Sequence, residues 1–250
     1  MFLELSGIVV IINLIGLIWC YTQQSDKVTD LFYSLSFFIV VTVLWWTAGN
    51  NWPQHLMLIM VGLWSIRLGA YLFKRIHSME KDVRFNQMRK KLLAISGFWT
   101  LQTVSIIIIS LPIAVLFSKE QIAWHPLHGI AFVVWLVGWL LETIADHQKF
   151  VFRNNPNNNG QFVHVGLWRY SQHPNYLGEM LCWIGVFMMT IPSLEQGDWI
   201  GLLSPLWIII LLRFVSGIPL LQRGAQKRYG HLSSFQNYRK NTALLVPFVY

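Results

Sequence analysis

The sequence predicts an all-α integral membrane protein with seven transmembrane helices, and composition is the first observation behind this prediction. The chain is 54% hydrophobic and only 12% charged, with 13 Trp and 16 Phe, and its mean hydropathy of +0.47 is far above that of soluble domains. The second observation is a series of apolar stretches of about 20 residues, each long enough to cross a bilayer. They cover roughly 3–21, 31–48, 55–73, 98–117, 126–148, 174–191 and 199–221.

The third observation is the uneven distribution of Lys and Arg over the loops. Of the 19 cations, 16 lie in the loops after the first, third and fifth spans or in the tail from residue 222, and Lys119 is alone on the opposite side. Cytoplasmic loops are enriched in such residues, so we expect the N-terminus outside and the C-terminus in the cytoplasm. The loop after the third span holds the largest cluster, which we interpret as a topology signal that contacts anionic lipid, with ligand binding as the alternative: Lys74, Arg75, Lys81, Arg84, Arg89, Lys90 and Lys91.

Several short segments of the chain are consistent with a membrane protein of seven spans. The first span follows no basic segment and has no small-residue cleavage site, so we expect a retained helix. Cys20 and Cys182 lie in apolar spans and are expected to pack there. The His125-Pro-Leu-His128 segment has no neighbouring Cys or acid, so no metal site is predicted. The Asn-rich run at 154–160 predicts a turn that ends the extension of the fifth helix, and 222–241 predicts an amphipathic tail.

Polar residues recur at helical spacing inside three of the apolar spans. At about 100° per residue each set falls on one face of its helix, and a polar face does not favour contact with lipid. All three faces lie toward the predicted cytoplasmic ends, so we expect a shared polar cavity that admits an anionic ligand from water and an apolar partner from the bilayer. The sets are Trp64, Arg67, Tyr71 and Lys74; Glu142, Asp146, Lys149 and Arg153; and Gln172, Asn175, Glu179 and Trp183.

The most informative stretch, 166–179, leads directly into the sixth span. Pro174 disfavours helix before it and suits the first turn of a helix, so a loop is expected to enter a helix here. Structural alternatives remain open: the acids and cations of the stripes can join helices as ion pairs, Glu179 can pair with Arg213, and His173 can serve as a capping or packing residue. Six residues of the stretch can bind or move charge: Arg169, Tyr170, His173, Asn175, Tyr176 and Glu179.

At these residues the chain resembles the C-terminal domain of the steroid 5-alpha-reductase family, and most closely its bacterial relatives. The resemblance covers about 126–250. It rests on Glu142-Thr-Ile-Ala-Asp146-His-Gln with Phe152-Arg153, on the whole of 166–179, on Ser216-Gly-Ile-Pro-Leu-Leu, on Tyr229-Gly with Tyr238-Arg, and on Val246-Pro-Phe. It implies a seven-helix membrane domain that holds NADPH in a cytoplasm-facing cavity and reduces a carbon–carbon double bond conjugated to a carbonyl.

The resemblance also implies where the cofactor binds. The family's cofactor positions carry over to Asp146, Arg153, Asn175, Glu179 and Tyr229. Arg223 is a looser match, because its spacing to Tyr229 differs from the spacing in the steroid enzymes. With their neighbours on the same polar stretches, the predicted cofactor-binding residues are Glu142, Asp146, Arg153, Arg169, His173, Asn175, Tyr176, Glu179, Arg223 and Tyr229. Arg153, Arg169, Arg223 and Arg228 can bind phosphate through paired hydrogen bonds, and this surplus of cations favours NADPH over NADH.

Tyr71 and Glu179 are the predicted catalytic residues. Hydride transfer to an enone requires a donor to the carbonyl oxygen in a dry site, and Tyr71 is a neutral donor on the polar face of the third span. In the steroid enzymes a Tyr on this helix works with a Glu on the preceding one. Here the second span has no carboxylate, which puts a steroid substrate in doubt without affecting hydride transfer.

Two other functions remain open. Isoprenylcysteine and phospholipid methyltransferases carry a similar Arg-His-Pro-x-Tyr motif and bind S-adenosylmethionine, but they have paired acids where this chain has Gln222-Arg223. A non-enzymatic lipid-binding role is the third possibility. We expect a single membrane domain over 1–250, with N-terminal spans and a basic loop over 1–97 and the reductase-like part over 98–250. In the bacterial inner membrane it would take an apolar substrate from the bilayer and contact lipid, without nucleic acid or an obligate protein partner.

Overall fold

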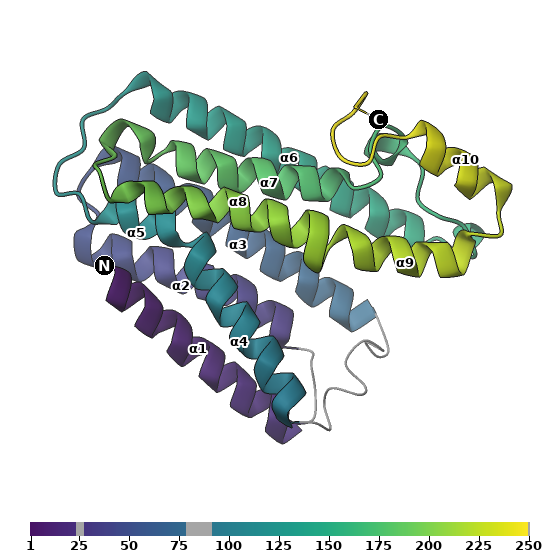
Figure 1. Ribbon diagram of the computed structural model, residues 1–250, viewed down its shortest axis with the longest axis horizontal. Coiled ribbons are helices and arrows are strands. Elements are labelled where there is room, and N and C mark those ends of the chain that lie inside the picture. The colour runs from purple at the N-terminus through teal and green to yellow at the C-terminus, as the bar shows by residue number, and fades with distance from the viewer. Residues whose placement is uncertain (24–27, 79–91, 250) are drawn as a thin grey trace. The chain divides into compact units, whose positions relative to one another are not determined.

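The computed structural model describes residues 1–23, 28–78 and 92–249 of the chain (Figure 1). Within these ranges the regular structure is helical, and the only β-type pairing is an isolated bridge between Ser171 and Ala243. Seven helical segments of the described residues are long and apolar enough to cross a membrane. The predicted fold class, an all-α membrane protein with seven spans, is therefore confirmed.

The chain forms two compact units. The first comprises Met1–Phe132 with Val186–Ser204, and the second comprises Val133–Gly185 with Pro205–Tyr250. The boundaries fall inside helices, because α6 (Pro126–Asn154), α7 (Pro174–Met188) and α8 (Leu203–Ile210) each contribute residues to both units. The reductase-like part expected from residue 98 onward is accordingly divided between the two units.

The first unit contains α1 (Phe2–Gln23), α2 (Thr29–Ala48), α3 (Trp52–Ser78), α4 (Leu92–Ile109) and α5 (Leu111–Phe117). Cys20, Ile95 and Trp99 form a buried apolar cluster between α1 and α4. A polar network crosses the same helices: the Asn13 side-chain amide donates to Ser36 Oγ at 3.3 Å, and Gln102 donates to Asn13 Oδ1 at 3.0 Å. Buried polar groups require such partners, so this network orients α1, α2 and α4 against one another.

The predicted fourth span is two helices. The break falls at Ser110, because Pro112 lacks a backbone N–H and is tolerated only near the start of a helix. After α5, the Lys119 ammonium binds Glu195 at 3.0 Å and Asp198 at 2.7 Å. Partial burial lowers the pKa of Lys119, but the hydrogen bonds to Asp198 and Glu195 outweigh this effect and raise it. The pairs join the loop after α5 to the connection between the short helices η4 (Ile191–Ser193) and η5 (Asp198–Leu202), and to the first residue of η5.

The second unit is built on the close approach of α6 and α7. A methyl group added at Gly178 would lie 2.6 Å from both the Gly138 carbonyl oxygen and the Glu142 backbone nitrogen. Only glycine leaves room for backbones at this separation. The approach brings the acids of α6 beside the first turns of α7. The loop between the two helices contains η2 (Pro156–Asn158) and η3 (Gly166–Arg169).

The seventh span is interrupted. After α8 the chain forms a π-helical turn, η6 (Leu211–Val215), and bends at Ser216-Gly217 before α9 (Ile218–Tyr229). Pro219 in the first turn of α9 cannot donate to the preceding turn, which explains the break. Figure 1 shows α9 continuing beyond α8. The expected amphipathic tail is thus partly the last turns of α9, followed by a separate helix, α10 (Ser233–Asn241).

Two other expectations concern particular residues. Cys20 and Cys182 are buried thiols at 2% and 1% exposure, as expected for residues that pack inside spans. The basic cluster after the third span lies mostly outside the described residues: of its members, the structure describes only the side chain of Lys74, which is exposed.

Candidate functional site

A pocket of about 110 Å³ lies within the second unit. It is formed where the end of α6, the loop before α7, α9 and α10 meet. Its lining residues are Lys149 and Arg153; Gln161, Phe162, Val163, Trp168, Gln172 and His173; Leu221, Gln222, Ala225, Arg228 and Tyr229; and Phe235, Tyr238 and Arg239.

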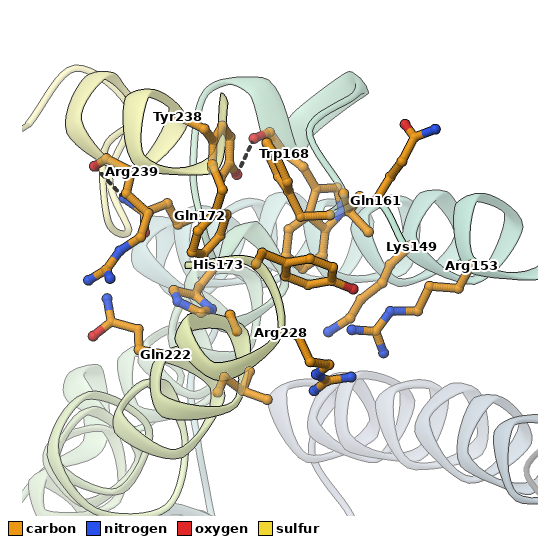
Figure 2. Close-up of a pocket in the computed structure, with 16 residues that line it drawn as sticks. Lys149, Arg153, Gln161, Trp168, Gln172, His173, Gln222, Arg228, Tyr238 and Arg239 are labelled. Atoms are coloured by element: carbon orange, nitrogen blue, oxygen red, sulfur yellow. Dashed lines mark hydrogen bonds between the residues drawn. The ribbon is translucent and has the colours of Figure 1, made fainter. Parts of the chain in front are cut away.

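The charged side chains among the described lining residues are all cations. Lys149 and Arg153 on α6, Arg228 on α9 and Arg239 on α10 line the pocket, and the described lining residues include no carboxylate. Figure 2 shows the ends of Lys149, Arg153 and Arg228 gathered on one side, with Arg239 on the other. Guanidinium groups bind phosphate and carboxylate oxygens through paired hydrogen bonds. The pocket is therefore suited to an anionic ligand with several charged oxygens.

The wall between α9, α10 and the loop before α7 is aromatic. Phe162 is at its centre, with its ring centroid 5.1 Å from those of Phe235 and Tyr238 and 6.1 Å from that of Tyr229. The Tyr238 hydroxyl donates to the Trp168 carbonyl at 2.6 Å (Figure 2). Burial raises the pKa of Tyr238, so this group remains a neutral phenol. Planar faces beside cations favour a ligand that combines a ring system with phosphate groups.

Trp168 and Gln148 attach the loop before α7 to α6. The Trp168 indole N–H donates to the Ala145 carbonyl at 3.0 Å, and Gln148 Oε1 accepts from the Leu167 backbone at 2.9 Å. Gly166 has a φ of +58°, and a methyl group there would meet the Gln148 side chain at 2.5 Å, so the turn requires glycine. The Lys149 ammonium lies 5.0 Å above the centre of the Trp168 ring, which fixes this cation at the pocket edge.

His173 lines the pocket although its side chain is only 7% exposed. Its ring stacks on Tyr176, with a centroid distance of 5.7 Å and an angle of 12° between the planes. Within the described part of the chain, its Nδ1 atom is enclosed and has no hydrogen-bond partner. Burial first, and then Lys149, Arg213 and Arg239, lower the pKa of His173 to about 3. The imidazole is therefore neutral at physiological pH.

Gln172 joins the same loop to the end of the chain. Its backbone N–H donates to the Ala243 carbonyl at 2.8 Å, and its side-chain amide donates to the carbonyls of Thr242 at 2.7 Å and Arg239 at 3.2 Å. These bonds hold α10 and the following segment against the pocket. They also fix the backbone immediately before His173.

The acids of the α6 stripe lie deeper in the second unit. Glu142 and Asp146 are 3% and 5% exposed, whereas Lys149 is half-buried and Arg153 is exposed. The Asn175 amide nitrogen donates to Asp146 Oδ1 at 3.2 Å, and Asn175 Oδ1 is enclosed without a partner among the described residues. The stripe thus changes along α6 from buried acids beside α7 to cations at the pocket.

The structure places the predicted cofactor residues in four groups. Arg153, His173 and Tyr229 line the pocket. Glu142, Asp146 and Asn175 lie where α6 and α7 meet, with half-buried Glu179 one turn further along α7. Tyr176 stacks on His173. Arg169 and Arg223 are exposed and are not among the residues that line the pocket. Their roles all remain predictions.

Tyr71, the predicted catalytic donor, is half-buried on α3 in the first unit, and its role also remains a prediction. Sequence reasoning assigned no cofactor role to several pocket residues. The aromatic residues come from segments whose pairing the sequence does not reveal. These additional residues are Lys149, Phe162, Trp168, Phe235, Tyr238 and Arg239, whereas Arg228 in the lining is one of the cations expected to bind phosphate.

Comparison with known proteins gives one family match. The model of the family described as "Protein of unknown function (DUF1295)" matches residues 17–242. The chain is 29% identical over 133 residues to the 3-oxo-5-alpha-steroid 4-dehydrogenase 1 of Mus musculus, and 30% identical over 133 residues to that of Rattus norvegicus. These alignments cover 52% of this chain and 46% and 45% of the relatives, so the chain spans about half the length of the curated relatives it matches. No solved structure matches significantly.

Proposed function

Because the chain belongs to the DUF1295 family and is steroid 5-alpha-reductase-like, we propose that it is a membrane-embedded, NADPH-dependent reductase. Its reaction is the reduction of a carbon–carbon double bond conjugated to a carbonyl, in an apolar lipid-like or steroid-like substrate. The relatives share only part of their length with this chain, so the argument for activity depends on the site itself.

The observation that carries the proposal is the pocket of the second unit, with four cations, an aromatic wall and no carboxylate among its described lining residues. NADPH combines phosphate groups with planar rings, and the lining offers partners to both. The volume of about 110 Å³ is suited to a phosphate-bearing part of the dinucleotide rather than to the whole. S-adenosylmethionine carries a sulfonium cation, which four neighbouring cations would repel. The pocket therefore favours the reductase over the methyltransferase.

The residues present fit the cofactor. Arg153 and Arg228 would bind phosphate oxygens, and Asn175, which the resemblance assigns to the cofactor, lies beside Asp146 and outside the pocket lining. When bound, NADPH supplies a hydride. The buried acids of α6 hold the start of α7 through the bond between Asp146 and Asn175, and this bond keeps Asn175 in place when the cofactor is absent.

Tyr71 is proposed as the donor to the substrate carbonyl, with Glu179 as the second catalytic residue. A phenol donates a hydrogen bond without the cost of burying a charge, and loss of one such donor typically lowers a chemical rate by about 10²–10³-fold. We expect Tyr71→Phe to retain NADPH affinity and thermal stability while reduction of any accepted enone falls by this factor. A Tyr71→Phe protein with turnover within a few-fold of wild type would exclude Tyr71 from the mechanism.

The proposed orientation places the pocket at the cytoplasmic face, where NADPH is available, while the substrate enters from the bilayer. This part of the proposal depends on the loop cations. A reporter fused to the C-terminus should be cytoplasmic and one inserted at residue 196 should be outside. If both reporters are found on the same side, the orientation is wrong.

The reaction is tested by isotope transfer. Purified full-length protein is incubated with NADPH deuterated at nicotinamide C4 and with a panel of steroid, isoprenoid and fatty enones, and the products are analysed by mass spectrometry. The proposal expects one deuterium on the β-carbon of a saturated ketone. Mass spectrometry of ligands released from the native protein separates the alternatives, because co-purified S-adenosylmethionine in place of NADP(H) would contradict a reductase.

A further inference from the structure

The imidazole of His173 is the only histidine ring among the described residues that line the pocket. His173 is only 7% exposed, and yet it lines the pocket. Its Nδ1 atom is enclosed and has no partner in the described residues. Buried polar atoms are normally hydrogen-bonded, and this one is not, so the ring is held by its backbone and its packing rather than by a bond to Nδ1.

The ring is held in place from several directions. The His173 backbone N–H donates to Ser171 Oγ at 3.2 Å, and the His173 carbonyl accepts from Tyr176 and Leu177 in the first turn of α7. The side chain stacks on Tyr176. The preceding residue, Gln172, is fixed to Ala243 and Thr242. A side chain fixed before the ligand arrives loses little entropy on binding.

Burial and three cations keep the ring uncharged. Burial has the largest effect, and Lys149 on α6, Arg213 on η6 and Arg239 on α10 add to it, so that the pKa of His173 is about 3. The ring is therefore neutral between about pH 5 and 8, where exposed histidines titrate. A neutral imidazole has one donor and one acceptor nitrogen.

The ring nitrogen of His173 that a ligand can reach determines which nitrogen must carry the proton. A ligand cannot reach the enclosed Nδ1 atom, so the ring can meet a ligand only through Nε2. The neighbouring side chains Lys149 and Arg239 are donors, and a ligand that satisfies them presents acceptor oxygens. Only an Nε2–H tautomer can also bond to such a ligand.

We propose that His173 is a phosphate-positioning residue whose neutral Nε2–H donates a hydrogen bond to a phosphate group of the nucleotide. This inference rests on the proposed function. A neutral donor adds a hydrogen bond without increasing the repulsion among the cations of the pocket. The same principle applies to neutral histidines that polarise substrate oxygens in other enzymes.

The test compares three variants of the full-length protein: His173→Gln, His173→Asn and His173→Phe. The Gln side chain places its amide nitrogen close to the position of Nε2, whereas the Asn amide nitrogen lies near that of Nδ1. Phe retains the aromatic volume and the stack on Tyr176 but has no donor. NADPH affinity is measured by equilibrium dialysis, and thermal unfolding of the same ligand-free samples is measured in parallel.

We expect His173→Gln to bind NADPH within about threefold of wild type, and His173→Asn and His173→Phe to bind at least about tenfold more weakly, which corresponds to the loss of one hydrogen bond. The Phe variant should keep the wild-type melting temperature. The assignment of Nε2–H would be overturned if His173→Phe bound NADPH with wild-type affinity. It would also be overturned if His173→Asn retained NADPH affinity while His173→Gln lost it. If the wild-type protein itself shows no saturable NADPH binding, the proposed function fails instead.

A second measurement requires only one of the variants to fold. In protein labelled with ¹⁵N-histidine, the resonances of His173 are those missing from the His173→Gln spectrum, or from that of His173→Phe if only that variant folds. We expect a protonated Nε2 and an unprotonated Nδ1 at pH 7, and a shift of the Nε2 resonance on addition of NADPH. A protonated Nδ1, or a spectrum that NADPH leaves unchanged, would overturn the proposal.

Discussion

The side-chain amide of Asn175 donates a hydrogen bond to Asp146 Oδ1 across 3.2 Å, and this bond joins the first turn of α7 to a buried carboxylate of α6. It connects the two helices that carry most of the predicted cofactor residues. The pair therefore combines a structural role with the proposed binding role, and these two roles can be separated by measurement.

Asn175→Ala is expected to remain folded and to lose NADPH affinity by at least about tenfold. The lost hydrogen bond to a charged group should lower the free energy of unfolding by roughly 1.5–3 kcal/mol. Circular dichroism, thermal unfolding and equilibrium dialysis on the same preparation measure these effects. An unfolded variant would assign Asn175 to structure alone, and unchanged NADPH affinity would remove it from the site.

Gly178→Ala should destabilise the contact between α6 and α7, because the added methyl group would lie 2.6 Å from backbone atoms of Gly138 and Glu142. Overpacking of this kind costs about 1–3 kcal/mol. Gly62→Ala is the matched control, since a methyl group at this α3 position meets nothing within 4 Å and favours the helix. Unfolding in mixed micelles measures both variants, and equal stability of the two would contradict the close approach.

The lowered pKa of His173 predicts that this residue makes a pH-dependent contribution to the free energy of unfolding. Its pKa is about 3 in the folded protein and about 6.5 in the unfolded chain. Between these values the unfolded state binds more protons, so the contribution is complete above about pH 6.5 and decreases as the pH falls toward 3, by at most about 1.4 kcal/mol per pH unit. Unfolding free energies of wild type and His173→Gln should therefore converge or cross on acidification from pH 7 to 4.5. A constant difference over this range would contradict a depressed pKa.

The sequence assigns both Arg223 and Arg228 of α9 to phosphate, and the pocket distinguishes them. Both side chains are exposed, but Arg228 lines the pocket and Arg223 does not. We expect Arg228→Ala and Arg153→Ala to weaken NADPH binding by about 1.5–3 kcal/mol through loss of a charge-assisted bond, and Arg223→Ala to have little effect. Titration calorimetry measures all three. Loss of binding by Arg223→Ala alone would contradict the assignment made from the pocket.

The sequence was sufficient to predict the fold class and the number of spans, because hydrophobic length is a direct consequence of bilayer thickness. It also placed Glu142, Asp146 and Asn175 on facing stripes, and the structure brings Asp146 and Asn175 into contact. The breaks at Ser110 and Ser216-Gly217 were not predicted, since the hydrophobicity continues through them. Both are explained by a proline soon afterwards that lacks a backbone donor.

The aromatic wall of the pocket could not be predicted from the sequence. Phe162, Tyr229 and Phe235 come from a loop, the end of α9 and the start of α10, and helical periodicity gives no information about contacts between such segments. The same applies to Gln172, whose bonds to Thr242 and Ala243 bring together residues about 70 positions apart. Long-range pairing through single hydrogen bonds leaves no pattern in the sequence.

The proposed function is tested most directly by the binding of NADPH to the purified full-length protein, with NADH and S-adenosylmethionine as competitors. The account predicts saturable NADPH binding, at least about tenfold weaker binding of NADH through loss of one phosphate contact, no competition by S-adenosylmethionine, and loss of the preference for NADPH in the Arg153→Ala/Arg228→Ala double variant. Saturable binding of S-adenosylmethionine without binding of NADPH would contradict it.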